Sequence, residues 1–379
     1  MSKVRSAAAL LLVTIAAVLD IGSRAGPFGR TETSPSEDRV RVYVENYLKK
    51  QHIPGCAVMV RYNGKVAVSR GYGFANVEHS VAVTEKTLFQ SASVGKQFTA
   101  IAIMILAEEH KVNLDDPVSK YLAVPISWSG IKLRHLLTHT SGLGDYPDWV
   151  TYKENFSEDE LLKMVTDSPL SFDPGKSFQY SNLGYVTLGI LIHRVTGKFY
   201  GDFLQERVFH PLHMSDTRVI SDEDIIPNRA AGYVLDKNGF LRNQPWVSAT
   251  FNSTADGTLY FNVGDLAKWD EALESEKLVS HDSFEQIWTP FMRQNDCDNG
   301  YGFGWYVCND DSGHRIMWHY GRWQGFSSYI VRYPFQRLTV AVLCNCFDVK
   351  AGEIAEHIAA LYLPAIARSV NGRYPHNPR

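Results

Sequence analysis

The stretch that decides the fold is FQSASVGKQFTAIAIMILAEEH, residues 89–110. It begins with small polar residues and becomes apolar from Gln97 onward, with a pattern that fits a buried helix better than a strand. Ser91 or Ser93 is expected to cap that helix, because a serine hydroxyl can accept from the unpaired backbone N–H groups of a first turn. Ser93 and Lys96 stand three residues apart, so their side chains should share one face of the first turn.

This spacing is compatible with nucleophilic catalysis. A serine hydroxyl is a poor nucleophile until a base removes its proton, and a lysine can be that base when burial or nearby positive charge lowers its pKa. Ser-x-x-Lys alone does not decide the matter, because the chain has a second copy at Ser129 and Lys132.

The composition excludes several classes of protein. The 379 residues are enough for two domains and a sizeable core. A net charge of −3 gives no indication of nucleic acid or an anionic membrane as a partner. No spacing of cysteine and histidine fits a metal site, and we expect neither a metal nor a cofactor.

The N-terminal segment predicts export. Lys3 and Arg5 precede an apolar run over residues 7–19, and small residues follow it. This is the layout of a signal peptide covering residues 1–25, followed by a flexible leader at 26–35. The run is short for a membrane span, so stable membrane insertion is not expected; a retained N-terminal anchor is the alternative. The mature protein would then be periplasmic or secreted.

The cysteine count is odd, which leaves at least one thiol unpaired in an exported monomer. Export permits a disulfide between Cys297 and Cys308, which the sequence does not decide. Cys344 and Cys346 lie in a strand-like run and are expected as buried free thiols. The fifth cysteine is Cys56.

The order of elements predicts one antiparallel sheet that is built from both ends of the chain. A helix at 36–52 and a hairpin at 55–73 with its turn at Asn63-Gly64 come first, while three strands at 314–347 and a helix at 350–363 come last. The middle reads as helices broken by long loops. We therefore predict an α/β (α+β) fold, with an antiparallel sheet flanked by helices and a large, mostly helical insert. The boundaries that follow are 36–112 and 291–366 for the two parts of the sheet domain, 113–290 for the helical domain and 367–379 for a C-terminal tail.

Two further motifs accompany Ser93. Tyr180-Ser181-Asn182 follows a Pro-Gly turn, and His319-Tyr320-Gly321 lies at a strand end. Each motif is weak alone, because a tyrosine, an asparagine or a histidine in such a place is most often a packing or turn residue. The order of the three motifs and their flanking residues carry more information.

Taken together, these segments resemble the penicillin-recognising serine hydrolases, a family that includes class C β-lactamases, D-alanyl-D-alanine carboxypeptidases and related esterases. The resemblance covers roughly residues 36–366 and implies a β-lactamase/transpeptidase-like fold. The segments that carry it are FQSASVGKQFTA, VNLDDPVSKYL, LRHLLTHTSGL, FDPGKSFQYSNLGY, DLAKW, YGFGW and HYGRWQGFSS, in the family's order.

The resemblance implies roles for single residues. Ser93 would be the acylated nucleophile, and Lys96 would hold or take its proton. Tyr180 would be the partner base, a phenolate kept charged by Lys96 and a helix N-terminus, and the choice of base between these two residues stays open. Asn182 would orient Lys96 and the substrate amide. The two backbone N–H groups of the oxyanion hole map to Ser93 and Arg322.

The third motif departs from the β-lactamase pattern. His319 stands where β-lactamases usually have a lysine, and a histidine is only partly charged near neutral pH, so it would hold a substrate carboxylate less firmly. Gly321 and Arg322 are expected to contact substrate. The Arg322 side chain either supplies a permanent positive charge or points to solvent. The Glu-x-x-Leu-Asn motif of class A enzymes is absent from the sequence.

These observations predict an exported serine hydrolase that forms an acyl-enzyme at Ser93 and acts on D-amino-acid peptides, short esters or related amides. A class C-like β-lactamase is the alternative, and His319 counts against it. A catalytically silent binding or structural homologue is the alternative of another class, and the intact motifs count against that one. Loops at about 144–157 and 215–255 are expected to shape the pocket for a small-molecule or peptide substrate.

Overall fold

The computed structural model describes residues 35–291, 293–294 and 299–364. The predicted signal peptide, the C-terminal tail and Cys297 lie outside these residues, so the question of a bond between Cys297 and Cys308 falls outside them too. Within them, no helix has both the length and the apolar character needed to cross a membrane.

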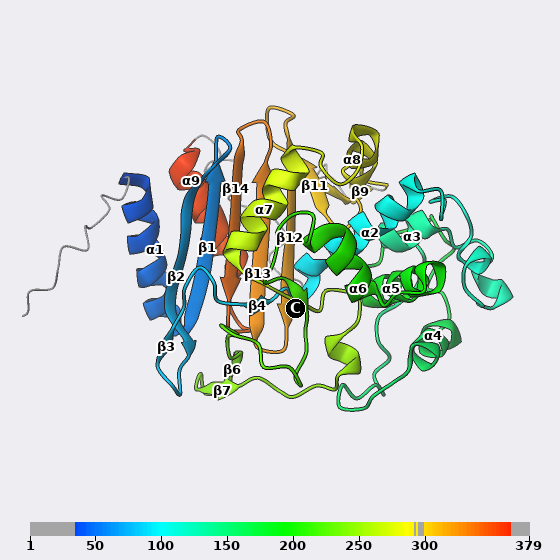
Figure 1. The fold of residues 1–379 in the computed structure, drawn as a ribbon, viewed down its shortest axis with the longest axis horizontal. Helices are drawn as coiled ribbons and strands as arrows, with labels where there is room; N and C mark the ends of the chain where they lie inside the picture. The colour runs from blue at the N-terminus through cyan, green and yellow to red at the C-terminus, as the bar shows by residue number, and fades with distance from the viewer. Residues whose placement is uncertain (1–34, 292, 295–298, 365–379) are drawn as a thin grey trace, which may run out of the picture.

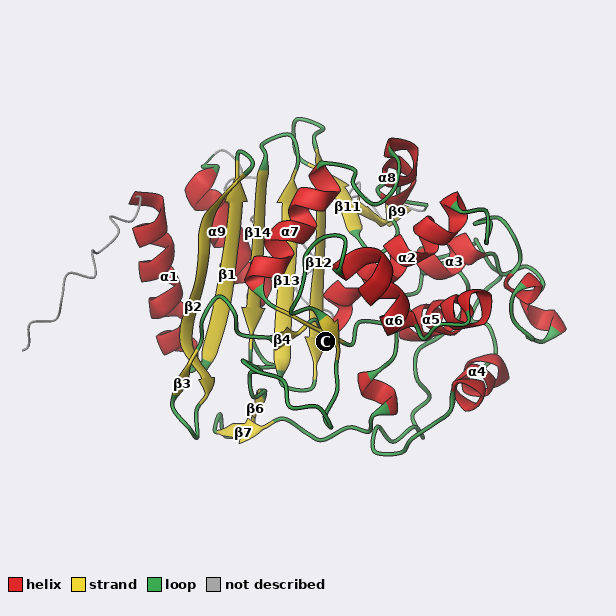
Figure 2. Ribbon diagram, viewed as in Figure 1, coloured by secondary structure: helices red, strands yellow, loops and turns green. Residues whose placement is uncertain are grey.

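A nine-stranded antiparallel sheet forms the centre of the molecule (Figures 1 and 2). The strand order is β3-β2-β1-β14-β13-β12-β11-β10-β9. The strands are β1 (Gly55–Tyr62), β2 (Lys65–Asn76), β3 (Val81–Ala82), β9 (Arg293–Gln294), β10 (Asn299–Tyr301), β11 (Tyr306–Asn309), β12 (Arg315–Trp323), β13 (Phe326–Tyr333) and β14 (Leu338–Cys344).

The sheet joins the two ends of the chain. β1 pairs with β14 from Cys56 opposite Cys344 to Tyr62 opposite Leu338, so the first strand and the last are neighbours in the middle of the sheet. The predicted antiparallel sheet built from both termini is therefore confirmed. The predicted hairpin turn is also present, because Asn63 and Gly64 both have the positive φ angles that a tight two-residue turn requires.

Helices cover both faces of the sheet. The helices are α1 (Pro35–Gln51), α2 (Lys96–Glu108), α3 (Leu133–Leu137), α4 (Glu158–Asp167), α5 (Asn182–Thr196), α6 (Tyr200–Leu204), α7 (Val263–Glu274), α8 (His281–Ile287) and α9 (Ala351–Tyr362). Helices α1 and α9 pack on the face that carries Val58, Val60 and Val342, while α2 and α7 contribute to the core against the other face. β13 and β14 lie between these two layers and are buried along their whole length; β14 is mostly apolar, while β13 also buries Ser327, Ser328 and Arg332.

The helical region lies beside the sheet and contains α3, α4, α5 and α6 (Figure 1). Two small sheets lie against the main sheet: one is made of β4 (Phe89–Gln90), β8 (Leu259–Phe261) and β5 (Arg218–Val219), with β4 in contact with β13, and the other of β6 (Tyr233–Leu235) and β7 (Leu241–Asn243), with Tyr233 bridged to Cys346. One helix departs from the predicted division: α7 belongs to the range 113–290 but packs on β1, β2 and β14 of the main sheet.

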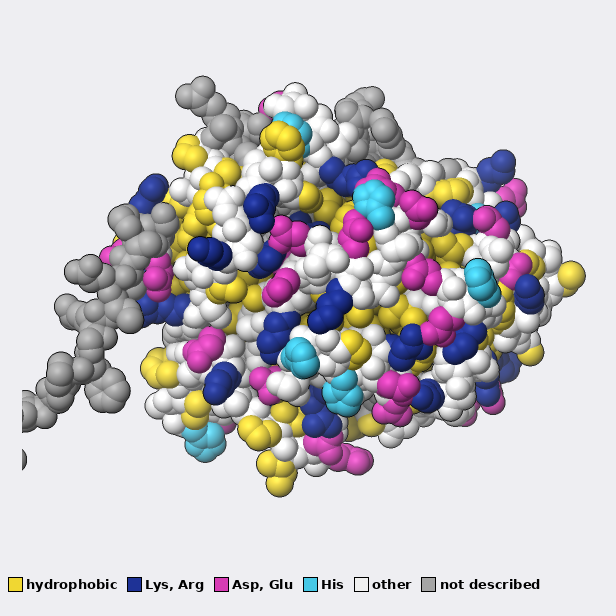
Figure 3. Space-filling view, turned by 45° about the horizontal axis from the view of Figure 1, so that its top comes forward, with side chains coloured by type: hydrophobic (Ala, Val, Ile, Leu, Met, Phe, Trp, Pro, Cys, Tyr) yellow, Lys and Arg dark blue, Asp and Glu magenta, His cyan; other side chains and the backbone are white. Residues whose placement is uncertain are grey.

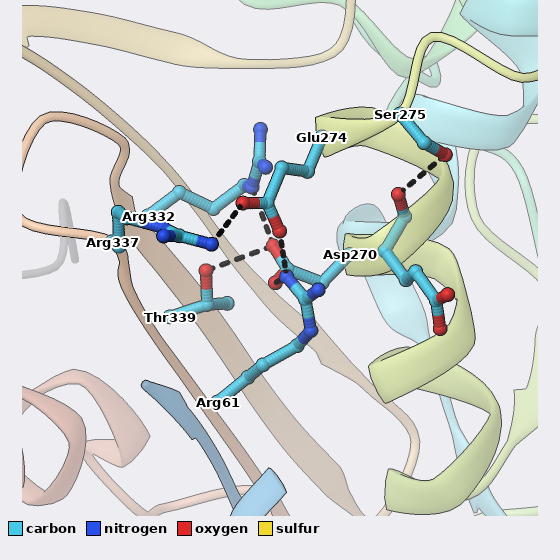
Figure 4. A network of polar contacts seen from close by, with 8 residues as sticks. Arg61, Asp270, Glu274, Ser275, Arg332, Arg337 and Thr339 are labelled. Atoms are coloured by element: carbon cyan, nitrogen blue, oxygen red, sulfur yellow. Dashed lines mark hydrogen bonds and ion pairs between the residues drawn. The ribbon is translucent and has the colours of Figure 1, made fainter. Parts of the chain in front are cut away.

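A network of ion pairs fixes α7 to that sheet (Figure 4). Asp270 is 2% exposed and accepts hydrogen bonds from Arg61 of β1 (3.0 Å), Arg332 of β13 (2.6 Å) and Thr339 of β14 (2.8 Å). Glu274, one turn later and 38% exposed, also pairs with Arg61. One buried carboxylate thus ties three strands to a single helix.

The face in Figure 3 carries basic and acidic side chains in alternation, with no broad area of one sign. Such a mixed surface generates only a weak long-range field on this side of the molecule.

Candidate active site

Ser93 lies in a tight turn directly ahead of α2. The turn is a short 3-10 segment, η1 (Ala92–Gly95), and the α-helix begins at Lys96. Ala92 has φ +46°, a left-handed conformation that is uncommon for a residue with a side chain. The nucleophile position is therefore held in an unusual local backbone and is partly exposed, while the helix behind it is buried.

The prediction that Ser91 or Ser93 caps this helix is wrong. The N-cap of α2 is Gly95, and no side chain caps it. The Ser91 hydroxyl instead donates to the carbonyl of Gly257 (2.6 Å) and accepts from the N–H of Leu259 (3.1 Å). Ser91 therefore ties the turn to the segment before β8.

Lys96 is completely buried and reaches back to the nucleophile. Its Nζ donates to Ser93 Oγ (3.1 Å), to Asn182 Oδ1 (2.7 Å) and to the backbone carbonyl of Asp256. These three acceptors use all three N–H donors of the ammonium group. Burial lowers the pKa of Lys96 to about 8, although the charges of Asp256 and Asp145 oppose the shift. This amine gives up its proton far more readily than an exposed lysine.

The second Ser-x-x-Lys pair has none of these features. Ser129 is exposed at the end of a short 3-10 turn. The Lys132 side chain is 44% exposed, and its amine pairs with Asp115 at 3.3 Å. Only the pair at Ser93 combines a buried amine with a hydroxyl that accepts its hydrogen bond.

Tyr180 presents a neutral phenol to the site. Its ring centroid lies 5.0 Å from Lys96 Nζ, and its hydroxyl is buried without a hydrogen-bond partner among the described residues. Burial raises the pKa of Tyr180 well above 10; the nearby Ser93 hydroxyl opposes this rise but does not complete a well-formed hydrogen bond. The structure therefore does not support the predicted phenolate.

His319 is buried and neutral. Its Nδ1 donates to the carbonyl of Tyr320 (2.6 Å), which leaves Nε2 to accept from the hydroxyl of Tyr301 (2.9 Å). Burial, reinforced by the charge of Lys96, lowers the pKa of His319 to about 3. The expected partial positive charge is therefore absent from this histidine at neutral pH, and neither ring nitrogen is free for a substrate carboxylate.

Gly321 brings β12 against Ser93. A Cβ on this residue would lie 2.7 Å from the backbone nitrogen of Ser93 and 2.8 Å from the Cβ of Ala92, so only glycine permits the contact. Arg322 is the next residue of the strand, and successive side chains point to opposite faces. Its guanidinium lies over the ring of Phe347, 5.0 Å from the centroid. The Arg322 side chain thus neither faces Ser93 nor points simply to solvent.

Aromatic groups that the sequence did not single out enclose the site. The His139 ring lies 4.2 Å from the ring of Tyr180 and 4.5 Å from that of Tyr301, measured between centroids. Its Nδ1 accepts from the N–H of Ser181 (3.1 Å), and burial lowers its pKa well below the usual range. His139 lies in the quoted segment LRHLLTHTSGL, and Tyr301 is the first residue of YGFGW. Both residues therefore belong to segments that carry the family resemblance, but no role was attached to either of them.

Asp145 is a second residue that sequence reasoning missed. Its Oδ2 accepts from Asn182 Nδ2 (3.0 Å), and its Oδ1 accepts from the N–H of Tyr146 (2.9 Å). It lies in the predicted pocket loop and remains exposed to solvent. The described residues contain no group of three or more side chains that could hold a metal ion.

Comparison with known protein families gives a match over most of the chain. The family model Beta-lactamase matches residues 40–363. Penicillin-binding protein 4* of Bacillus subtilis is 31% identical over 315 residues, which cover 79% of this chain and 69% of that protein. Protein flp of Staphylococcus aureus is 29% identical over 340 residues, covering 86% of this chain and 66% of the relative. The chain thus spans about two thirds of the length of these relatives.

Solved structures agree with this match. A penicillin-binding protein homologue from Pyrococcus abyssi, described as octameric, superposes with a TM-score of 0.78 at 28% identity over 86% of this chain and 77% of that one. A penicillin binding protein from Bacillus halodurans gives a TM-score of 0.76 at 26% identity over 84% and 99%. A D-stereospecific amidohydrolase from Streptomyces, at 21% identity over 87% of this chain and 99% of that one and with a TM-score of 0.75, shares the fold. The resemblance inferred from the motifs is confirmed, and the chain belongs to the Beta-lactamase family, the penicillin-recognising serine hydrolases.

Proposed function

We propose that this chain is an exported serine hydrolase that forms an acyl-enzyme at Ser93 and acts on D-amino-acid peptides, short esters or related amides. One observation carries the proposal. The fully buried Lys96 amine, with a pKa of about 8, donates to Ser93 Oγ at 3.1 Å. A depressed lysine pKa beside a hydroxyl is the arrangement that activates a serine nucleophile.

In the proposed mechanism Lys96 acts in its neutral form. It takes the proton of Ser93 as the hydroxyl attacks the substrate carbonyl, and it passes this proton on to Tyr180 once the phenol has protonated the leaving group. The amine, now neutral again, takes a proton from the attacking water and returns it to Ser93 Oγ as the acyl group leaves. The order of pKa values supports this assignment, because Tyr180 holds its proton more firmly than Lys96 does. The Tyr180 phenol, whose hydroxyl has no other partner among the described residues, then donates its proton to the leaving group.

The carbonyl oxygen becomes negative as the bond to Ser93 forms. We assign its stabilisation to the backbone N–H groups of Ser93 and Arg322, on the family resemblance and on the close approach of β12 to the nucleophile at Gly321. Such donors typically lower the barrier by about 3–4 kcal/mol each. Asn182, which accepts from Lys96, keeps one amide proton available for the substrate.

Preference for esters and amides over β-lactams follows from the charge of the site. A β-lactam presents a carboxylate, and His319 is neutral while the Arg322 guanidinium lies over Phe347 on the other face of the sheet. These observations weigh against a class C-like β-lactamase as the main activity.

The test of the proposal is covalent labelling. A fluorophosphonate probe should label the wild-type protein and the Ser129→Ala variant, while Ser93→Ala should not react. Ser129→Ala is the matched control, because it removes the serine of the exposed second pair. Labelling that persists in Ser93→Ala would falsify the mechanism.

Export is tested at the N-terminus of protein purified from its native host. Sequencing should find a mature N-terminus near Gly26. An intact Met1 would contradict cleavage and favour a retained anchor or a protein that is not exported.

A further inference from the structure

The charges around Ser93 are distributed unevenly. The Lys96 ammonium is enclosed by three acceptors, so it offers no free donor to a ligand. His319 is neutral, and the Arg322 side chain lies on the other face of the sheet. Two carboxylates act on Lys96: Asp256, which has the larger effect, is half-buried, and Asp145 is exposed.

Asp145 is connected to the nucleophile by side chains alone. It accepts from Asn182 at 3.0 Å, Asn182 accepts from Lys96 at 2.7 Å, and Lys96 donates to Ser93 at 3.1 Å. Because Asn182 is the residue expected to face the substrate amide, Asp145 lies where the acyl half of a substrate begins. Asp145 is an exposed residue, so a ligand can reach it without first opening the core; partial desolvation raises the pKa of its carboxyl group, and the hydrogen bond from the Tyr146 N–H and the charge of Lys96 oppose that rise.

Aromatic rings continue from this carboxylate toward β12. Tyr146 directly follows Asp145, and its ring centroid lies 5.7 Å from that of Tyr152. Tyr152, which is 38% exposed, packs edge-on against Trp323 at 5.4 Å, two residues beyond Gly321. Aromatic faces attract cations and also bury apolar groups. The carboxylate and the rings together provide an environment for a positively charged amine that carries a small apolar group.

We propose that Asp145 selects acyl donors with a free, positively charged amine on the carbon next to the scissile carbonyl. This inference rests on the proposed function of Ser93. The substrate ammonium donates a charge-assisted hydrogen bond to the Asp145 carboxylate while its carbonyl carbon lies at Ser93 Oγ. Acylation of the amine removes the charge and leaves only one neutral N–H donor, so the charge-assisted hydrogen bond is lost. A carboxylate at the same position is repelled.

The experiment compares two substrates that differ only at the amine, D-alanine p-nitroanilide and its N-acetyl derivative. Wild-type protein should favour the free amine in kcat/KM by about tenfold or more. Asp145→Asn should reduce that preference about tenfold, mostly because kcat/KM falls for the free-amine substrate. Asp148→Asn, an exposed aspartate on the same loop, is the matched control and should retain the wild-type preference.

Two results overturn the proposal: a wild-type preference for the acetylated substrate, or an unchanged ratio in Asp145→Asn. If neither nitroanilide is turned over, protection of Ser93 from the fluorophosphonate probe decides instead. D-Alaninamide should slow labelling of the wild type more than N-acetyl-D-alaninamide does, and equal or absent protection overturns the proposal. Failure of the proposed function is a distinct outcome, because the probe would then not label Ser93 at all.

Discussion

At the scale of single residues, Lys96 and His319 show how burial decides protonation around the nucleophile. Both side chains are completely buried, and burial lowers both pKa values. The consequences differ because the starting points differ. Lys96, with its pKa brought to about 8, is partly neutral just above neutral pH, whereas His319, with its pKa brought to about 3, carries no charge over the whole physiological range.

The first prediction concerns the pH dependence of catalysis. If neutral Lys96 is the base, kcat/KM for a neutral ester should rise with pH through an apparent pKa near 8, because the fraction of neutral amine in the free enzyme rises there. Asp256→Asn should move this rise to lower pH, since the charge of Asp256 holds the pKa of Lys96 up. A profile that is flat between pH 6 and 9 would contradict the assignment.

The second prediction concerns His319. Because its pKa lies near 3, lowering the pH from about 8 to about 5 adds no charge to it. The ratio of kcat/KM for a carboxylate-bearing substrate to that for a neutral ester should therefore stay constant across this range. A ratio that increases at low pH with an apparent pKa near 6.5, the value of an exposed histidine, would show that His319 is accessible and charged.

At the scale of elements, the contact between α7 and the sheet depends on one buried carboxylate. Asp270→Asn leaves Arg61 and Arg332 without their shared counter-charge, and removing one partner of a buried ion pair costs about 3–5 kcal/mol. The more exposed Glu274 provides the matched control, because Glu274→Gln should cost about 1 kcal/mol or less. Urea unfolding measures the free energy of unfolding of both variants. Equal losses of stability in the two would contradict the special role of the buried Asp270 carboxylate.

The elements that the sequence predicted are those whose formation depends on neighbouring residues. Asn63-Gly64 fixes the hairpin by its positive φ angles, and the apolar run of β14 requires burial on both faces. The alternation of side chains along a strand also predicts that Arg322 points away from Ser93, because its neighbour Gly321 faces Ser93. The placement of α7 was not predictable in this way, because it depends on ion pairs between residues more than 200 positions apart.

At the scale of the whole molecule, the order of motifs predicted the fold. The structure places Ser93, Lys96 and Asn182 within hydrogen-bond distance, as the resemblance implied. The order of motifs did not predict the surroundings of the site. Asp145 and Asp256 come from loops, where no periodicity indicates which side chains point inward. The neutral state of His319 and Tyr180 results from burial of the imidazole and of the phenol hydroxyl by segments distant in sequence, which only the folded structure reveals.

The pairing of β1 with β14 has a consequence for how the protein is made. Synthesis delivers Ser93 early, but the strand that closes the sheet beside β1 ends at Cys344, close to the end of the described chain. A growing chain still attached to the ribosome therefore carries Ser93 without the complete sheet that supports it until β14 has been made. Chains arrested before residue 338 should be inert to the probe, and reactivity should appear only once β14 has emerged. If Ser93 is the nucleophile, its reactivity then depends on a strand that is synthesised about 250 residues later, and the site stays silent until that strand has paired with β1.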